Sequence, residues 1–123
     1  KVMVIDYFPQ LQNTLTLPLC GESRVSYAYI KPSKYKLFEN IIATKFNDVC
    51  WLYRSEDLIE QNWFGLFQPN PRLYDRVGDY VLLMKDNYIM KDFLLGEERK
   101  FNTGNHGGVS SLEMFVPLIF FEL

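Results

Sequence analysis

Histidine and cysteine, the residues that most often build metal sites and disulfide frameworks, are scarce in this sequence. Its 123 residues include one histidine and two cysteines. Without a Cys-x-x-Cys pair or a cysteine–histidine cluster, a structural zinc site is not expected. Cys20 and Cys50 both stand among apolar residues, and two cysteines are too few for a disulfide framework. We therefore expect two buried free thiols in a reducing, cytoplasmic compartment.

Long apolar runs and an excess of basic residues are also lacking. The longest apolar stretch, 114–121, is far shorter than the roughly 20 residues that a membrane-spanning helix needs. Only four apolar residues separate Lys1 from Asp6, which does not resemble a secretory signal. The formal net charge is −2, whereas proteins that hold nucleic acid through its phosphates usually carry a basic excess. We therefore expect neither a membrane nor a specific nucleic-acid partner.

The apolar residues that are present suffice for one hydrophobic core. Hydrophobic residues make up 48% of the chain and charged residues 23%, as in ordinary globular domains. Alternating, β-branched and aromatic residues predict strands at 2–5, 14–17, 24–31, 49–53, 79–85, 88–90 and 118–121. A long helix capped by Ser33 and a short helix capped by Ser55 are predicted from N-cap and spacing signals. The apolar stripe of the long helix consists of Leu37, Phe38, Ile41, Ile42 and Phe46.

The order of these segments predicts an α+β fold with a mixed sheet, one long helix, one or two short helices and a β-hairpin. The strand–helix–strand series over 24–53 predicts a parallel pair with a right-handed crossover. Asp86 and Asn87 predict the turn of a hairpin between the strands at 79–85 and 88–90. Residues 62–78 are expected to form a long loop rich in aromatic residues.

We divide the chain into a lead-in segment at 1–24, an α+β domain at 25–100, and a C-terminal loop with a return strand at 101–123. The chain opens at Lys1 without an initiator methionine and closes on an apolar run, which favours a fragment of a larger α/β protein. Methionine removal and short tails also occur in complete proteins, so that alternative stays open. A fragment that exposes apolar surface could form a homodimer.

The segment 104–118 is the strongest candidate for chemistry. His106 lies among glycines, where the backbone can bend sharply, and imidazole is the commonest metal ligand. Ser110 and Glu113 have capping-box spacing, which predicts a short helix that Pro117 ends. A metal site needs at least three protein ligands, and no spacing brings Asp residues to His106. From these residues alone, His106 is either a metal ligand or a solvated loop residue.

The run Gly104-Asn105-His106-Gly107-Gly108, followed by the 110–113 turn and by Met114-Phe115-Val116-Pro117-Leu118, resembles the C-terminal motif of the alkaline phosphatase superfamily. The similarity is greatest to its type I phosphodiesterase/nucleotide pyrophosphatase-like branch. Supporting matches lie at Gly21-Glu22-x-Arg24, at 71–73 and at 75–80, so the resemblance spans about 18–118.

This resemblance implies a two-metal phosphoester hydrolase, usually with two zinc ions, acting on a phosphoester or nucleotide. It implies that His106 is the last histidine ligand and that the preceding domain is a cap. The nucleophilic Ser or Thr and the remaining Asp and His ligands have no counterpart here, so the chain alone is expected to be inactive. Two metal ions would polarise the phosphoryl oxygens and activate the nucleophile.

Arg72 and Arg76 could clamp a phosphate or stack on a base, or they could pair with nearby aspartates and cover apolar rings. Trp63, with Phe64 and Phe67, could line a substrate cleft or pack against protein. Three lysines at the start of the long helix favour either a phosphate site or a solvated helix end; they are Lys31, Lys34 and Lys36. The rival to a hydrolase is a non-enzymatic α+β module whose aromatic loop and basic helix start bind a partner or a small anion.

Overall fold

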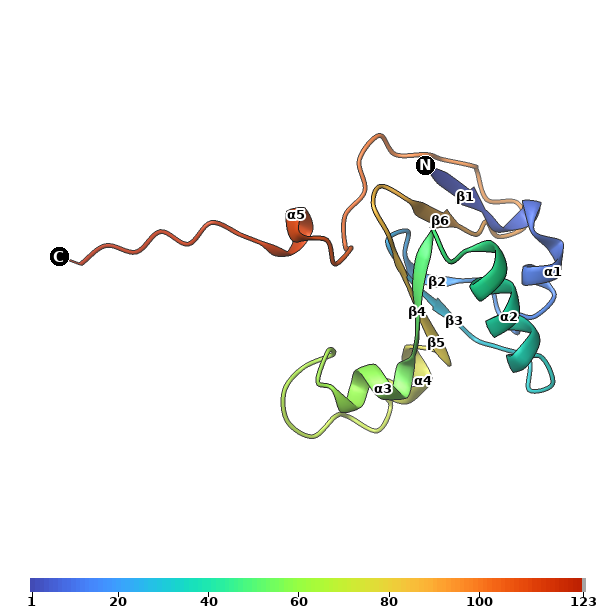
Figure 1. The fold of residues 1–123 in the computed structure, drawn as a ribbon, viewed down its shortest axis with the longest axis horizontal. Coiled ribbons are helices and arrows are strands. Elements are labelled where there is room, and N and C mark those ends of the chain that lie inside the picture. Colours follow the sequence, from blue (N-terminus) through green and yellow to red (C-terminus); the bar gives the residue numbers. More distant parts are fainter. Residues whose placement is uncertain (123) are drawn as a thin grey trace.

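Helices and strands mix along the chain, which confirms the predicted α+β class (Figure 1). The computed structural model describes residues 1–122. The strands are β1 (Val2–Val4), β2 (Cys20–Glu22), β3 (Val25–Ala28), β4 (Cys50–Arg54), β5 (Tyr80–Met84) and β6 (Ile89–Lys91). The helices are the 3-10 turn η1 (Ile5–Tyr7), α1 (Pro9–Gln12), α2 (Tyr35–Lys45), α3 (Ser55–Glu60), α4 (Leu73–Arg76) and α5 (Ser111–Met114).

The main sheet has the strand order β2-β3-β5-β4, and every neighbouring pair in it is antiparallel. The predicted hydrogen-bonded parallel pair is therefore wrong. β3 and β4 do run in the same direction, since each is antiparallel to β5, but β5 lies between them. All five β5 residues are buried. A position inside the sheet, with a neighbouring strand on each edge, buries more of a strand than an edge position does, and β5 occupies such a position.

The predicted hairpin is also wrong, although its turn is present. Tyr88 N–H donates to Lys85 O at 3.0 Å, and Asp86 has a φ of 42°. After the turn, β6 pairs in parallel with β1 instead of returning along β5. Met90 N–H donates to Ser23 O at 2.9 Å, so the chain is drawn away from β5 toward β1 and the start of β3. The result is a separate sheet of two strands.

Helix α2 covers one face of the main sheet and supplies much of the core (Figure 1). Four residues of its predicted stripe are buried, namely Phe38, Ile41, Ile42 and Phe46. Leu37 is 44% exposed, because its helical position lies at the edge of this stripe, about 100° from Phe38 and about 140° from Ile42. The residue at the N-cap is Lys34, not the predicted Ser33. Ser55 likewise does not cap α3, because the N-cap of that helix is Arg54. The Ser55 hydroxyl instead donates to Val77 O at 2.9 Å.

The opposite face of the sheet carries a smaller apolar cluster. Leu58 of α3 packs there on Val81 and Leu83 of β5, and Phe64 and Val109 cover them in part. Val109 belongs to the C-terminal loop, so that loop takes part in the packing of the domain. Residues 1–24 also contribute to packing, because β1 pairs with β6 and the side chains of Leu11 and Leu15 are buried in the main core.

Two predicted strands are absent from the described part of the chain. The segment 14–17 makes a single bridge, between Leu15 and Ile30, and forms no strand. Residues 118–121 run away from the body as an extended tail whose side chains are 75–92% exposed (Figure 1). Both predictions are wrong although the segments are apolar, because a strand needs a neighbour to accept its hydrogen bonds, and the tail has none among residues 1–122. No helix within these residues is long and apolar enough to cross a bilayer.

The two cysteines lie in different environments, and the prediction that both are buried is wrong for one of them. Cys20, in edge strand β2, is exposed, whereas Cys50, in β4, is buried. β2 pairs only with β3, so its other edge and much of its surface meet solvent. Burial raises the pKa of the Cys50 thiol to about 12, which keeps it protonated at neutral pH.

The two thiols are therefore expected to react at very different rates. In the folded protein at pH 8, an aromatic disulfide reagent should label Cys20 rapidly, because the thiolate is the nucleophile and Cys20 is accessible. Cys50 should react only after unfolding in urea. The Cys20→Ser variant serves as the control and should show no rapid phase. Two rapid equivalents in the unsubstituted protein would contradict the burial of Cys50.

Candidate functional site

His106 lies in a loop without helix or strand that precedes α5. The imidazole is exposed. The next residue, Gly107, has a φ of 89°, a conformation that glycine adopts without strain, and an added Cβ there would contact the side chain of Glu22 at 3.6 Å. The loop thus passes close to the end of β2 while the His106 side chain is presented to the outside.

An ion pair between buried Arg24 and partly exposed Glu113 fixes the far end of this loop to the domain. Arg24, just before β3, is 4% exposed. Its Nε and Nη2 donate to the two carboxylate oxygens of Glu113 at 2.9 and 2.7 Å, which is the bidentate arrangement. Its Nη1 donates to the backbone oxygens of Tyr88 at 2.6 Å and Lys85 at 3.4 Å. The guanidinium therefore ties α5 to the turn that follows β5.

Glu113, which Arg24 holds, in turn hydrogen-bonds the loop. Its Oε1 accepts the Gly108 N–H at 3.0 Å, and its Oε2 accepts the Ser110 hydroxyl at 2.6 Å. The Ser110 N–H also points to Oε2, at 3.3 Å, and the predicted capping box of Ser110 and Glu113 is confirmed. One carboxylate thus holds the residue two positions after His106 and the first turn of α5.

The close approach of Gly108 to Glu113 requires a glycine. A Cβ built on Gly108 would lie 2.5 Å from Glu113 Oε1, closer than non-bonded atoms can come. The carboxylate cannot easily move aside, because both of its oxygens are held by Arg24. The glycine at this position therefore permits the contact that docks the loop.

The Arg24 hydrogen bonds are the largest influence on the acidity of Glu113. Together with the hydrogen bonds from Ser110, they outweigh the opposing effect of desolvation and lower the pKa of Glu113 to about 2. The carboxylate is therefore ionised at every physiological pH. The ion pair is a permanent connection there, not a switch.

The described residues, 1–122, contain no group of three or more His, Cys, Asp or Glu side chains placed to hold a metal ion. His106 alone offers one imidazole nitrogen. One imidazole cannot form a metal site without further ligands. The two-zinc centre and the role of His106 in it stay predictions.

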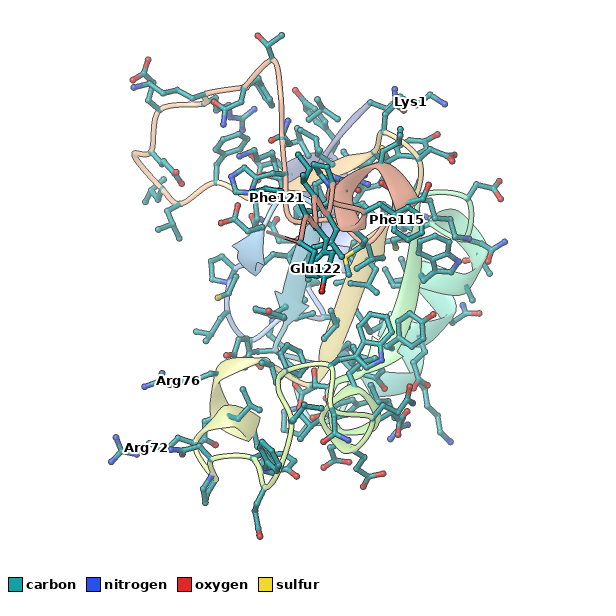
Figure 2. All side chains as sticks on the ribbon, turned by 90° about the vertical axis from the view of Figure 1, so that its left-hand side faces the viewer. Lys1, Arg72, Arg76, Phe115, Phe121 and Glu122 are labelled. Atoms are coloured by element: carbon teal, nitrogen blue, oxygen red, sulfur yellow. The ribbon has the colours of Figure 1, made fainter. Side chains whose placement is uncertain are left out.

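The other candidate residues lie away from His106. Arg72 is the N-cap residue of α4 and Arg76 its last residue. Both are exposed and extend outward from the body, far from Phe115 and Phe121 (Figure 2). Neither makes an ion pair with the aspartates around α4 in the described structure. Trp63 is 52% exposed, and its ring lies 6.3 Å from that of Tyr53.

Strand β5 separates these residues from the anchored loop. α4 precedes the first β5 residue, whereas Arg24 accepts a hydrogen bond at its backbone oxygen from Met84, the last β5 residue. Five strand residues span roughly 13 Å, so the two groups lie at opposite ends of the sheet. They can serve one substrate only if that substrate is long enough to reach both ends.

Sequence reasoning gave no role to Arg24 or to the polar cluster near the start of β5. There, Asp79 accepts hydrogen bonds from Ile30 N–H at 2.6 Å and Tyr35 OH at 2.9 Å, beside a cavity of about 270 Å³. Arg24 stands at the start of the strand predicted over 24–31, and the local pattern does not indicate that its guanidinium is buried and paired. A search of protein-family models, curated proteins and solved structures found no match to this chain.

Proposed function

We propose that this chain is the C-terminal part of a metal-dependent phosphoester hydrolase, to which it contributes a cap and the last metal-ligand histidine, His106. One observation carries the proposal. The glycine loop that bears His106 is docked through a bidentate ion pair between buried Arg24 and partly exposed Glu113, while His106 itself is exposed. The anchor holds the backbone of Gly108, two residues from His106, in place, and a fixed backbone beside an exposed imidazole is what a metal-ligand loop requires.

In the complete enzyme, two divalent metal ions, expected to be zinc, would polarise the phosphoryl oxygens and activate the nucleophile. His106 would supply one neutral imidazole nitrogen to this centre. The remaining ligands and the nucleophile would come from elsewhere in the polypeptide. The substrate class is a phosphoester or nucleotide, and Arg72, Arg76 and Trp63 are the cap residues proposed to meet its phosphate or base.

A non-enzymatic binding module is the second candidate, and the exposed aromatic loop favours it. Trp63 and Phe67 are 52% and 89% exposed, and Leu66 beside them is also exposed. Adjacent exposed apolar side chains of this size often mark a contact with another protein. This candidate includes self-association into a homodimer, which the same surface and the apolar tail would support.

The decisive test replaces His106 with alanine in the complete enzyme, meaning the full reading frame that contains these residues. Hydrolysis of bis(p-nitrophenyl) phosphate with Zn²⁺ or Mn²⁺ should fall by about 10²-fold or more, because loss of a ligand removes several kcal/mol of metal-derived stabilisation. Lys45→Ala, an exposed change in the last turn of α2, is the control and should retain activity. Full activity of His106→Ala would overturn the ligand assignment and leave the binding module as the better candidate.

A further inference from the structure

β4 is an edge strand whose outer side is open in the described part of the chain, since β5 is its only neighbour there. Beyond the end of β4, Ser55 N–H donates to Asp79 O at 3.0 Å. Because hydrogen bonds alternate along an antiparallel strand, the odd-numbered β4 residues face β5. Leu52 and Arg54 therefore direct their backbone N–H and C=O groups to the open edge. Such a row of groups is a template for another strand.

A groove runs along this open edge, between β4 and α2. It has a volume of about 310 Å³, and its walls include Ile42 and Ala43 of α2 and residues 50–53 of β4. No described β5 residue lines it, so the groove lies on the outer side of β4. Trp51 and Tyr53 beside it are 44% and 37% exposed. An extended segment would find here both a backbone template and apolar contacts for alternate side chains.

The C-terminal tail of this chain is a segment of that kind. Residues 115–121 run away from the body, and their hydrophobic side chains apart from Pro117 are 75–92% exposed (Figure 1). The segment carries no charge. Proline is tolerated at the first position of a strand, and residues 118–121 after it all carry an N–H group. Strand β2, at the other edge of the sheet, is a poorer partner, because it is three residues long and includes Gly21 and Glu22.

The contact area indicates how many tails take part. The exposed apolar side chains of one tail present on the order of 800 Å². A strand laid in a groove buries about half of its surface and a similar area of the groove, so one docked tail buries about 800 Å² and two bury about 1,600 Å². The smaller area is that of a weak contact, and the larger is that of a stable interface. Reciprocal docking of two tails about a two-fold axis therefore accounts for a stable complex.

We propose that two copies of this chain form a symmetric dimer by strand exchange. Residues 118–121 of each copy add to the outer edge of β4 of the other copy and place alternate side chains in the groove between β4 and α2. This inference rests on the second candidate function, whose self-association it specifies, and not on the hydrolase. The tail leaves its own body after α5, which the ion pair between Glu113 and Arg24 anchors, and points outward to where a second copy can meet it (Figure 1).

Sedimentation velocity of the full chain over a concentration series tests the proposal. The double variant Ile119→Pro/Phe120→Pro removes neighbouring N–H groups, so that one hydrogen bond to β4 is lost in either register. Ala43→Glu places a charged side chain in the groove. All three residues are exposed, so the monomer should stay folded. Each variant should dimerise roughly 10-fold more weakly per site, which is about 100-fold for the two sites together.

Two matched controls and a local probe accompany these variants. Leu95→Pro, in an exposed turn, and Thr44→Glu, on α2 outside the groove, should dimerise as the unsubstituted chain does. In amide hydrogen exchange, Leu52 and Arg54 should be protected at high concentration and should exchange faster on dilution. The amide of Leu82, inside the sheet, should stay protected throughout and report that the domain is folded.

Weaker dimerisation in both the tail and the groove variants, with concentration-dependent protection of Leu52, supports the proposal. An unsubstituted chain that stays monomeric, or that forms species larger than a dimer, overturns it. Weakening in only one of the two variants would show that tail and groove do not meet. Protection of Leu52 that is independent of concentration would place the tail on its own β4 and overturn the exchange. Phosphoester hydrolysis by the complete enzyme is a separate measurement, so failure of the dimer and failure of the hydrolase are distinguishable.

Discussion

Replacing Phe46 with alanine is expected to lower the free energy of unfolding by about 3–5 kcal/mol. The Phe46 side chain is fully buried at the end of α2, and its ring meets that of Phe8 edge-on at a centroid distance of 4.8 Å. Truncation removes this aromatic contact and leaves a cavity between α2 and the segment before α1. Urea denaturation followed by far-UV circular dichroism measures the change as a shift of the transition midpoint.

Leu37→Ala supplies the matched control for this change. It also shortens an apolar side chain next to α2 core residues, but Leu37 is 44% exposed and leaves little cavity behind. The expected loss is below about 1 kcal/mol. Equal losses in the two variants would contradict the placement of Phe46 in the core and of Leu37 at its edge.

Acidification is expected to break the Arg24–Glu113 pair only near pH 2. The pKa of Glu113 in the folded protein, about 2, lies below its ordinary value of 4.5. Its stabilising contribution is therefore fully present above pH 4.5 and is lost as the pH falls through 2. The shift corresponds to at most about 3 kcal/mol, and to less in practice because the Glu113 side chain is one fifth exposed.

Nuclear magnetic resonance follows this titration directly. The Arg24 Nε–H and Gly108 N–H signals should move together with a midpoint near pH 2, because both donate to the same carboxylate. In Glu113→Gln, a neutral residue of the same shape, neither signal should titrate in this range. A midpoint near 4.5 in the unsubstituted protein would mean that the carboxyl group is not paired in solution.

Local patterns predicted the elements better than their pairing. The strand β5, the capping box at Ser110 and four of the five residues in the α2 stripe follow from spacing over a few residues, and the structure confirms them. The hairpin and the parallel pair failed because each depends on a choice between partners. That choice was decided by the burial of every β5 residue and by the Met90–Ser23 hydrogen bond, neither of which a local pattern contains.

The candidate site was predicted in part for the same reason. Its residue with ligand chemistry, His106, and its helix start at Ser110 are visible in a short stretch of sequence. The anchor is not, because Arg24 and Glu113 meet only once the sheet has formed. Glu113 could be assigned to the capping box from its spacing, but its second role requires a partner from the other end of the chain.

The position of β5 between β3 and β4 has a consequence for the order of folding. β3 and β4 are synthesised before β5. They are not neighbours in the sheet, so the sheet cannot form between them until β5, which ends at Met84, is available. On the ribosome, the first two thirds of the chain would emerge with unpaired strand edges. Because non-local pairing must close long loops before contacts compensate for the lost entropy, sheet formation should be late, cooperative and slow for a chain of this size.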